Sequence, residues 1–215
     1  MNNIKACIFD LDGVVVDTAK YHYLAWKRLA NELGFEFTQN DNERLKGVSR
    51  MDSLEILLKI GNKDFDEKTK IELAAKKNNW YVSYITNMDE SEILPGVKTF
   101  IKHLRDNDIK IALGSVSKNA MLILKKINLV PYFDSIIDGT KVTNAKPNPE
   151  VFLKAAKELN MNPSSCVVFE DAAAGIEAAI RAGMHSVGIG SKFILYKADK
   201  VICGFENIKL DILNF

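Results

Sequence analysis

Two pairs of acidic residues stand where apolar runs end. Asp10 and Asp12 follow the run IKACIF, and Glu170 and Asp171 follow SCVVF. Carboxylates gathered in one place repel one another unless a positive group lies among them. These segments contain no histidine and no pair of cysteines. Carboxylate oxygens alone are ligands that favour Mg²⁺ rather than Zn²⁺. The four residues therefore predict a magnesium-dependent site.

Hydroxyl groups and lysines follow two further apolar runs. Ser115, Ser117, Lys118 and Asn119 come after IKIALG, and Lys146 lies in the loop after FDSIID. Serine hydroxyls and helix N-terminal amides can bind phosphate. Together with a carboxylate nucleophile and Mg²⁺, they indicate phosphoryl transfer through an aspartyl phosphate. Taken singly, each residue is explained equally well as a turn residue, a helix cap or a solvated lysine.

Six apolar runs are typical of strands buried on both faces of a parallel sheet. They span residues 4–9, 109–115, 133–138, 165–171, 185–190 and 198–203. Helical patterns at 121–127, 149–159 and 173–182 lie between them, the second with Asn148 as its cap and Pro149 at its first position. This alternation predicts an α/β fold in which the chemistry-bearing residues meet at the carboxyl ends of the strands.

The segment after the first strand breaks the alternation. Amphipathic patterns at 19–34, 49–61 and 66–88 predict three helices with no strand among them. We expect an α/β core formed by residues 1–17 and 92–215, and a helical domain at 18–91 inserted into it. The turn Pro95-Gly96 is suited to bring the chain back to the core.

Composition narrows the classes of partner. The chain has 215 residues, 47% hydrophobic and 27% charged, with a formal net charge of +1. This balance argues against nucleic acid and acidic membranes as partners. No apolar run is long enough for a membrane helix, and the start of the chain does not read as a signal peptide. Cys7, Cys166 and Cys203 form no pairing pattern, so we expect three buried thiols in a cytoplasmic protein. Separately, we expect the protein to be a monomer.

The four motifs together resemble those of the haloacid dehalogenase (HAD) superfamily. FDLDGVVVDT resembles its D-x-D-G-x-x-x-D-[ST] signature, ALGSVSKN its second motif, AKPNPEVF its third and VVFEDAAAGI its fourth, in the family's order. The resemblance covers essentially the whole chain. It implies a Rossmann-like parallel sheet core with an inserted α-helical cap of the C1 type.

The resemblance also implies a role for each core residue. Asp10 is the nucleophile and Asp12 the general acid/base, with Lys146 and Ser115 as the other catalytic residues. Mg²⁺ is held by Asp10, the Asp12 backbone carbonyl and Asp171, with Glu170 binding or orienting it. The segment Val116, Ser117, Lys118 and Asn119 contacts the sugar or its second phosphate.

Within the superfamily, the inserted segment resembles the cap of the β-phosphoglucomutases. The stretch LKGVSRMDSL resembles their substrate-specificity loop, and DTAKYHYLAWKRLA and KKNNWYV agree with it. The resemblance implies that the cap binds substrate through His22, Trp26, Lys46, Gly47, Val48, Ser49, Arg50 and Lys77. Without these surroundings, Arg50 reads as an exposed helix-start arginine, Trp26 as a core aromatic and His22 as a surface histidine.

The implied function is a mutase that interconverts β-glucose 1-phosphate and glucose 6-phosphate through β-glucose 1,6-bisphosphate. The alternative is a phosphatase of the same fold acting on a hexose phosphate, because the core motifs serve both chemistries. A dehalogenase would leave the acidic pair unexplained, and a non-catalytic protein would be expected to lose motif residues. Two positions depart from the pattern: Ala172 stands where a serine is usual, and Gly114 where an alanine is usual.

Overall fold

The computed structural model describes residues 4–45 and 48–215. The chain divides into two units by its internal contacts. The larger unit contains the chain up to Asp17 together with Met88–Phe215, and the smaller unit is Thr18–Asn87. Each unit has a hydrophobic core of its own.

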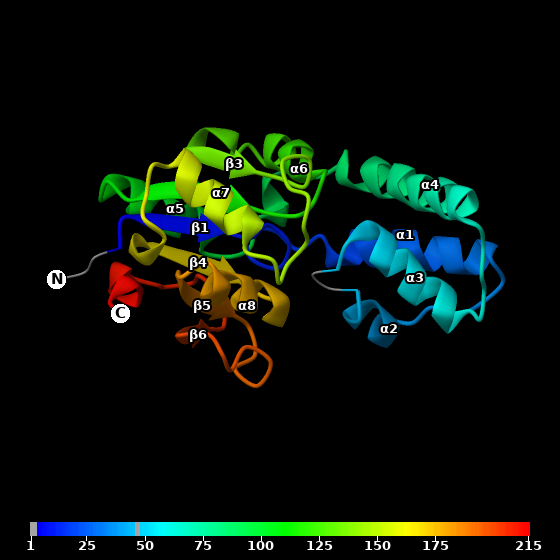
Figure 1. Ribbon diagram of the computed structural model, residues 1–215. Coiled ribbons are helices and arrows are strands. Elements are labelled where there is room, and N and C mark those ends of the chain that lie inside the picture. Colours follow the sequence, from blue (N-terminus) through cyan, green and yellow to red (C-terminus); the bar gives the residue numbers. More distant parts are fainter. Residues whose placement is uncertain (1–3, 46–47) are drawn as a thin grey trace. The chain divides into compact units, whose positions relative to one another are not determined.

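The larger unit is built on a six-stranded parallel sheet in the order β3-β2-β1-β4-β5-β6 (Figure 1). The strands are β1 (Ala6–Phe9), β2 (Lys110–Gly114), β3 (Ser135–Ile137), β4 (Cys166–Glu170), β5 (His185–Ile189) and β6 (Lys200–Ile202). Every residue of β1 and β4 is buried. The six predicted strands are confirmed, and the fold is the predicted Rossmann-like α/β sheet.

Helices cover both faces of this sheet. They are α5 (Val97–Asp106), α6 (Ala120–Lys126), α7 (Glu150–Glu158) and α8 (Ala173–Arg181). On one face, Ile8 and Val168 pack with side chains of α7 and α8. On the other face, Phe9 and Phe169 pack against Phe100 of α5. Short 3₁₀ helices lie in the described connections at Glu90–Glu92, Val130–Tyr132 and Pro163–Ser165, and another follows β6 at Leu210–Leu213.

The smaller unit is helical in the part that the structure describes. Its elements are α1 (Ala19–Glu32), α2 (Gln39–Glu43), α3 (Arg50–Ile60) and α4 (Glu67–Ile85). The core of this unit includes Trp26, Leu29, Phe37, Leu54 and Leu57, all of which are buried. Asp66 and Ser49 cap α4 and α3 through their side chains, which explains where these two helices begin.

Several local features differ from the sequence predictions. Helix α5 was not predicted, although its buried residues Val97, Phe100, Ile101 and Leu104 have the i, i+3, i+4, i+7 spacing of an amphipathic helix. The short α2 was also missed. Cys203 is exposed, contrary to the expected burial, because it follows the edge strand β6.

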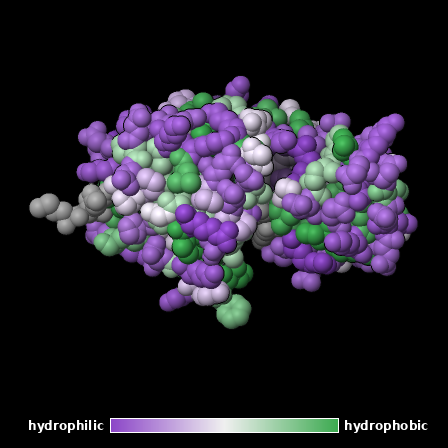
Figure 2. Space-filling view, viewed as in Figure 1, coloured by the Kyte–Doolittle hydropathy of each residue, from purple (hydrophilic) through white to green (hydrophobic). Residues whose placement is uncertain are grey.

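The surface of the units is mainly hydrophilic on the side shown in Figure 2, with hydrophobic side chains in small separate areas. Among the described residues, no helix combines the length and the hydrophobicity needed to cross a membrane.

Candidate active site

Backbone hydrogen bonds place two site residues immediately beyond the sheet. The Asp10 N–H donates to the Phe169 carbonyl at 3.0 Å, and the Ser115 N–H donates to the Ile137 carbonyl at 2.9 Å. Each bond continues the ladder between neighbouring strands by one residue. Asp10 and Ser115 therefore stand at the carboxyl edge of the sheet, where open α/β sheets bind ligands.

Lys146 lies between two carboxylates at this edge. Its Nζ donates to Asp10 Oδ1 at 2.5 Å and to Glu170 Oε2 at 2.8 Å. All three residues are buried, and Glu170 is only 1% exposed. A charge at such depth requires a charged or hydrogen-bonding partner, and the three side chains supply it to one another.

Asp171 completes a cluster of three carboxylates. Asp10, Glu170 and Asp171 each offer an oxygen, and these oxygens lie within 4.8 Å of one another. Among the described residues of this cluster, three carboxyl groups share the ammonium of Lys146. Such a cluster of hard oxygen ligands suits a divalent cation, so the residues present fit a metal ion.

Two groups of the site, Glu170 and Lys146, have shifted pKa values. Burial raises the pKa of the Glu170 carboxyl to about 8, and the Asp10 and Asp171 carboxylates add to the rise, while Lys146 opposes it. Burial by itself lowers the pKa of the Lys146 ammonium, but the adjacent Asp10 and Glu170 outweigh it and hold this pKa above its ordinary value. The lysine is therefore a fixed positive charge.

Two glycines make room for the acidic pair. A Cβ added at Gly13, whose φ is +79°, would lie 2.1 Å from Asp171 Oδ2. A Cβ added at Gly175, in α8, would lie 2.0 Å from the Glu170 carboxyl carbon. Both carboxylates thus rest directly against backbone that only glycine leaves open.

Asp12 follows β1, and Ser115 and its neighbours follow β2, at the same edge of the sheet. Asp12 is half-buried in the turn after β1, and its side chain is not among the three carboxylates grouped in the described structure. Ser115 is buried, and its Oγ accepts a hydrogen bond from the Ser117 N–H at 3.1 Å. Val116, Ser117 and Asn119 are partly exposed and Lys118 is exposed.

A second group of predicted residues lies within the smaller unit. Lys77 of α4 is buried, and its Nζ lies 2.9 Å from Nδ1 of His22 in α1. The same Nζ lies 4.4 Å from the centre of the Trp26 ring and 5.0 Å from that of Tyr81. Trp26 is 2% exposed and belongs to the core of the unit, so it is a core aromatic that also forms a cation–π contact.

His22 is held in its neutral form. Burial lowers its pKa well below the usual range, and the positive charges of Lys77 and Arg50 lower it further. Because an ammonium group can only donate, Nδ1 accepts from Lys77 and the ring proton resides on Nε2. The His22 ring also stacks on Tyr81 at 4.0 Å between centroids. His22 is partly exposed and has a polar partner in Lys77.

Three further predicted cap residues, Val48, Ser49 and Arg50, lie at the start of α3. Arg50 is its first residue and is half-buried, as are Val48 and Ser49. Ser49 caps the helix by accepting from the Asp52 N–H at 3.2 Å. Lys46 and Gly47 lie outside the described residues. Sequence reasoning overlooked Tyr81, although it lies four residues after Lys77 and therefore on the same helical face.

The sequence pattern of the family described as "Hydrolase: haloacid dehalogenase-like hydrolase" matches residues 4–183. A β-phosphoglucomutase of Bacillus subtilis (strain 168) is 40% identical over 98% of this chain and 94% of its own length. The crystal structure of a β-phosphoglucomutase from Clostridium difficile has a TM-score of 0.92, with 46% identity over 98% of this chain and 95% of the other.

Phosphatases are also among the relatives. A phosphorylated carbohydrates phosphatase of Thermotoga maritima is 33% identical over 86% of this chain and 84% of its own length. The similarity to the two β-phosphoglucomutases is higher in identity and in coverage of this chain.

Proposed function

The chain belongs to the haloacid dehalogenase-like hydrolase family, and on this premise we propose that it is a phosphosugar mutase, an isomerase that interconverts β-glucose 1-phosphate and glucose 6-phosphate. The observation that carries the proposal is that the two units hold side-chain groups of different charge. The larger unit holds a carboxylate cluster suited to phosphoryl transfer, and the smaller one holds positive side chains suited to a second phosphate.

We propose Mg²⁺ as the cofactor, held by Asp10, Glu170, Asp171 and the backbone carbonyl of Asp12. When bound, the ion would add positive charge to this cluster and would withdraw charge from the phosphoryl oxygens. The hard oxygens of the cluster and the room left by Gly13 and Gly175 support this assignment.

Asp10 acts as the nucleophile in the proposed reaction. Its carboxylate oxygen forms a bond to phosphorus while the bond from phosphorus to the sugar oxygen breaks, which leaves a phospho-aspartate. Asp12 gives a proton to the departing sugar oxygen and takes one from the attacking hydroxyl in the reverse direction. Lys146 and Ser115 orient and neutralise the phosphoryl oxygens, and in such transfers stabilisation is mainly electrostatic.

A mutase needs more than this transfer. Phospho-Asp10 gives its phosphoryl group to the 6-hydroxyl of β-glucose 1-phosphate, and the bisphosphate must then return its 1-phosphate to Asp10. In both orientations one phosphate waits while the other reacts. We propose that Arg50 holds the phosphate that is not being transferred, since a guanidinium binds phosphate in a bidentate manner. We also propose that His22 and Lys77 bind the sugar, with the buried Trp26 ring supporting Lys77.

We further propose that residues 18–91 serve as the cap domain and residues 1–17 and 92–215 as the catalytic core. A cap gives a reason why a phospho-enzyme would pass its group to a sugar and not to water, because it excludes water while substrate is bound. We propose that two further segments contact the substrate: Val116, Ser117, Lys118 and Asn119 in the core, and Lys46, Gly47, Val48 and Ser49 in the cap.

The deciding experiment supplies β-glucose 1-phosphate, Mg²⁺ and a trace of β-glucose 1,6-bisphosphate, and follows glucose 6-phosphate with a coupled dehydrogenase. We expect isomerisation to exceed release of inorganic phosphate by a wide margin. The α-anomer serves as the control and should not be isomerised. Rapid phosphate release without glucose 6-phosphate would replace the mutase by the second candidate, a hexose phosphate phosphatase, which the Thermotoga relative supports.

A further inference from the structure

The loop between β3 and α7 carries Lys146 into the active site. It runs from Asp138 to Pro149, and Lys146 is its buried lysine. At its start the Gly139 N–H donates to the Ser117 carbonyl at 3.1 Å, which ties the loop to the segment after β2. The position of Lys146 therefore depends on how the rest of this loop is held.

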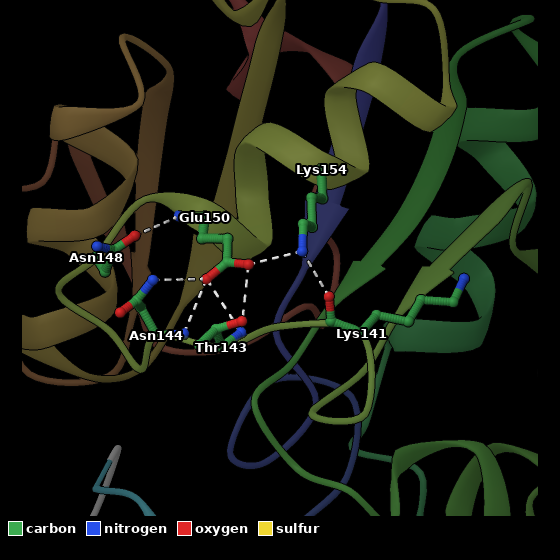
Figure 3. Close-up of polar contacts among 6 residues, drawn as sticks. All are labelled: Lys141, Thr143, Asn144, Asn148, Glu150 and Lys154. Carbon is green, nitrogen blue, oxygen red and sulfur yellow. Dashed lines mark hydrogen bonds and ion pairs between the residues drawn. The ribbon is translucent and has the colours of Figure 1, made fainter.

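Glu150, the first residue of α7, binds the loop from the other side. Its carboxylate accepts from the backbone N–H of Asn144 at 2.8 Å and from the N–H of Thr143 at 3.1 Å. It also accepts from the Asn144 side-chain amide at 3.0 Å (Figure 3). One side chain thus satisfies consecutive backbone donors two and three residues before Lys146.

Lys154, one turn further along α7, extends this connection. Its Nζ donates to Glu150 Oε1 at 2.6 Å and to the Lys141 carbonyl at 2.7 Å. On the far side of Lys146, the Asn148 side chain accepts from the Glu150 N–H at 3.0 Å (Figure 3). Glu150 therefore binds the chain before Lys146 through its carboxylate and the chain after it through its backbone N–H.

The charge of Glu150 is secured by the same contacts. Its hydrogen bond from Lys154 and those from Asn144 and Thr143 lower the pKa of its carboxyl to about 2. The Glu150 side chain is 17% exposed, and its hydrogen bond from Lys154 is partly buried. Glu150 is therefore a carboxylate over the whole pH range in which the enzyme would work.

We propose that Glu150 is a positioning residue, which acts on phosphoryl transfer by fixing the loop that carries Lys146. The inference rests on the proposed function, because it takes Lys146 as the group that neutralises the transferring phosphoryl. The Lys146 Nζ contacts both Asp10 and Glu170, so a shift of its backbone moves the ammonium relative to the nucleophile. Misplacement by about 1 Å can cost on the order of 10²-fold in rate.

The test uses hydrolysis of p-nitrophenyl phosphate, because this probe needs phosphoryl transfer to Asp10 whether the enzyme is a mutase or a phosphatase. We expect Glu150→Ala to lower kcat between about 10-fold and 100-fold, with KM changed less than about threefold. The matched control is Glu90→Ala. Glu90 also accepts from a lysine, Lys98, and from an asparagine amide, that of Asn128, but has no contact with this loop.

A double-mutant cycle separates positioning from a general loss of packing. If Glu150 acts through Lys146, then Glu150→Ala added to Lys146→Ala should lower the single-turnover rate by less than about twofold. An equal fold loss in both backgrounds would overturn the proposal, as would a Glu150→Ala rate within about twofold of the Glu90→Ala rate.

Milder variants keep the proposal testable if Glu150→Ala does not fold. Glu150→Gln retains one acceptor oxygen and should recover much of the rate that Glu150→Ala loses. Lys154→Met leaves both backbone contacts of Glu150 in place, so its rate should fall less than that of either Glu150 variant. Amide hydrogen exchange at Thr143 and Asn144 should accelerate in Glu150→Gln and not in Glu90→Ala. Unchanged exchange at both amides in Glu150→Gln, together with an unchanged rate, would overturn the proposal.

Discussion

Lys146 in the larger unit and Lys77 in the smaller unit are both buried, yet their surroundings differ in kind. Lys146 contacts two carboxylates, and Lys77 contacts a neutral imidazole and two aromatic rings. The first lysine lies in a cluster that contains three carboxyl groups. The second lies, with Arg50, close enough to His22 for both positive charges to lower the pKa of its imidazole.

On this difference we base the different partners proposed for the two groups. Clustered carboxyl groups attract a cation, whereas clustered positive side chains attract an anion. Phosphoryl transfer requires the first, and retention of a second phosphate requires the second. Breaking the two groups separately should therefore affect different steps.

The largest effect is expected from loss of the nucleophile. Asp10→Asn removes the group that receives the phosphoryl, so both isomerisation and p-nitrophenyl phosphate hydrolysis should fall by about 10⁴-fold or more. Steady-state assays of both reactions check this. Asp106→Asn, at the exposed end of α5, serves as the control and should keep the wild-type rates. Residual turnover near that of the control would remove Asp10 from the reaction.

Loss of Arg50 should separate the two reactions. Arg50→Ala is expected to lower isomerisation by about 10²-fold, because a charge-assisted phosphate contact is lost, while p-nitrophenyl phosphate hydrolysis stays within about threefold. Arg44→Ala, an exposed arginine at the end of α2, is the control. Equal losses of both activities in Arg50→Ala would mean that this arginine does not distinguish the substrates.

The carboxyl cluster should be visible in the pH dependence of stability. The pKa of Glu170 is about 8 in the folded chain and roughly 4.3 when unfolded. With the folded value raised, the stability is full below the unfolded pKa and is lost as pH rises through the folded one. The melting temperature of the metal-free protein should therefore fall as the pH rises from about 5 to about 9, the range that spans these two pKa values.

Two comparisons check this pH dependence by thermal unfolding. Glu170→Gln cannot ionise, so its melting temperature should depend less on pH over the same range. Mg²⁺ should raise the melting temperature of the wild type most at high pH, where the proton no longer competes for the carboxylate. A pH profile that is the same in Glu170→Gln and wild type would contradict the prediction.

The smallest expected effect concerns the helices that begin at the two groups. Helix α3 is capped by the Ser49 side chain, whereas α8 begins behind Ala172, whose backbone is extended and whose methyl group accepts no hydrogen bond. Ala172→Ser should raise the free energy of unfolding by about 1 kcal/mol, and Ser49→Ala should lower it by a similar amount. Urea denaturation measures both, and Ala173→Ser, one residue beyond the cap position, is the control that should not stabilise.

Local patterns were sufficient for much of the fold and for the main site residues. Buried strands followed by polar residues predicted that Asp10, Lys146, Glu170 and Asp171 would meet, and the structure brings them together. The short α2 escaped prediction because five residues give too little periodicity. The exposed Cys203 escaped it because an apolar run does not reveal whether its strand lies at an edge.

Gly114 illustrates a departure that the sequence left without a reason. A Cβ at this position would lie 2.9 Å from the Phe152 ring and 3.0 Å from an Ile8 methyl group, so an alanine would require the ring to shift. Phe152 in turn packs beneath Lys146, whose Nζ lies 4.9 Å from the ring centre. The smaller residue leaves space for the side chain that supports the lysine.

The sequence by itself determined the alternation of strands and helices, the order of the motifs and the chemical types at each strand end. These properties depend on residues that are close together in the chain. The tertiary structure alone decided the strand order, the contact of Gly175 with Glu170, the stacking of Tyr81 on His22 and the anchoring of the Lys146 loop by Glu150. Each of these depends on how side chains pack in space. The spacing of residues along the chain does not specify that packing.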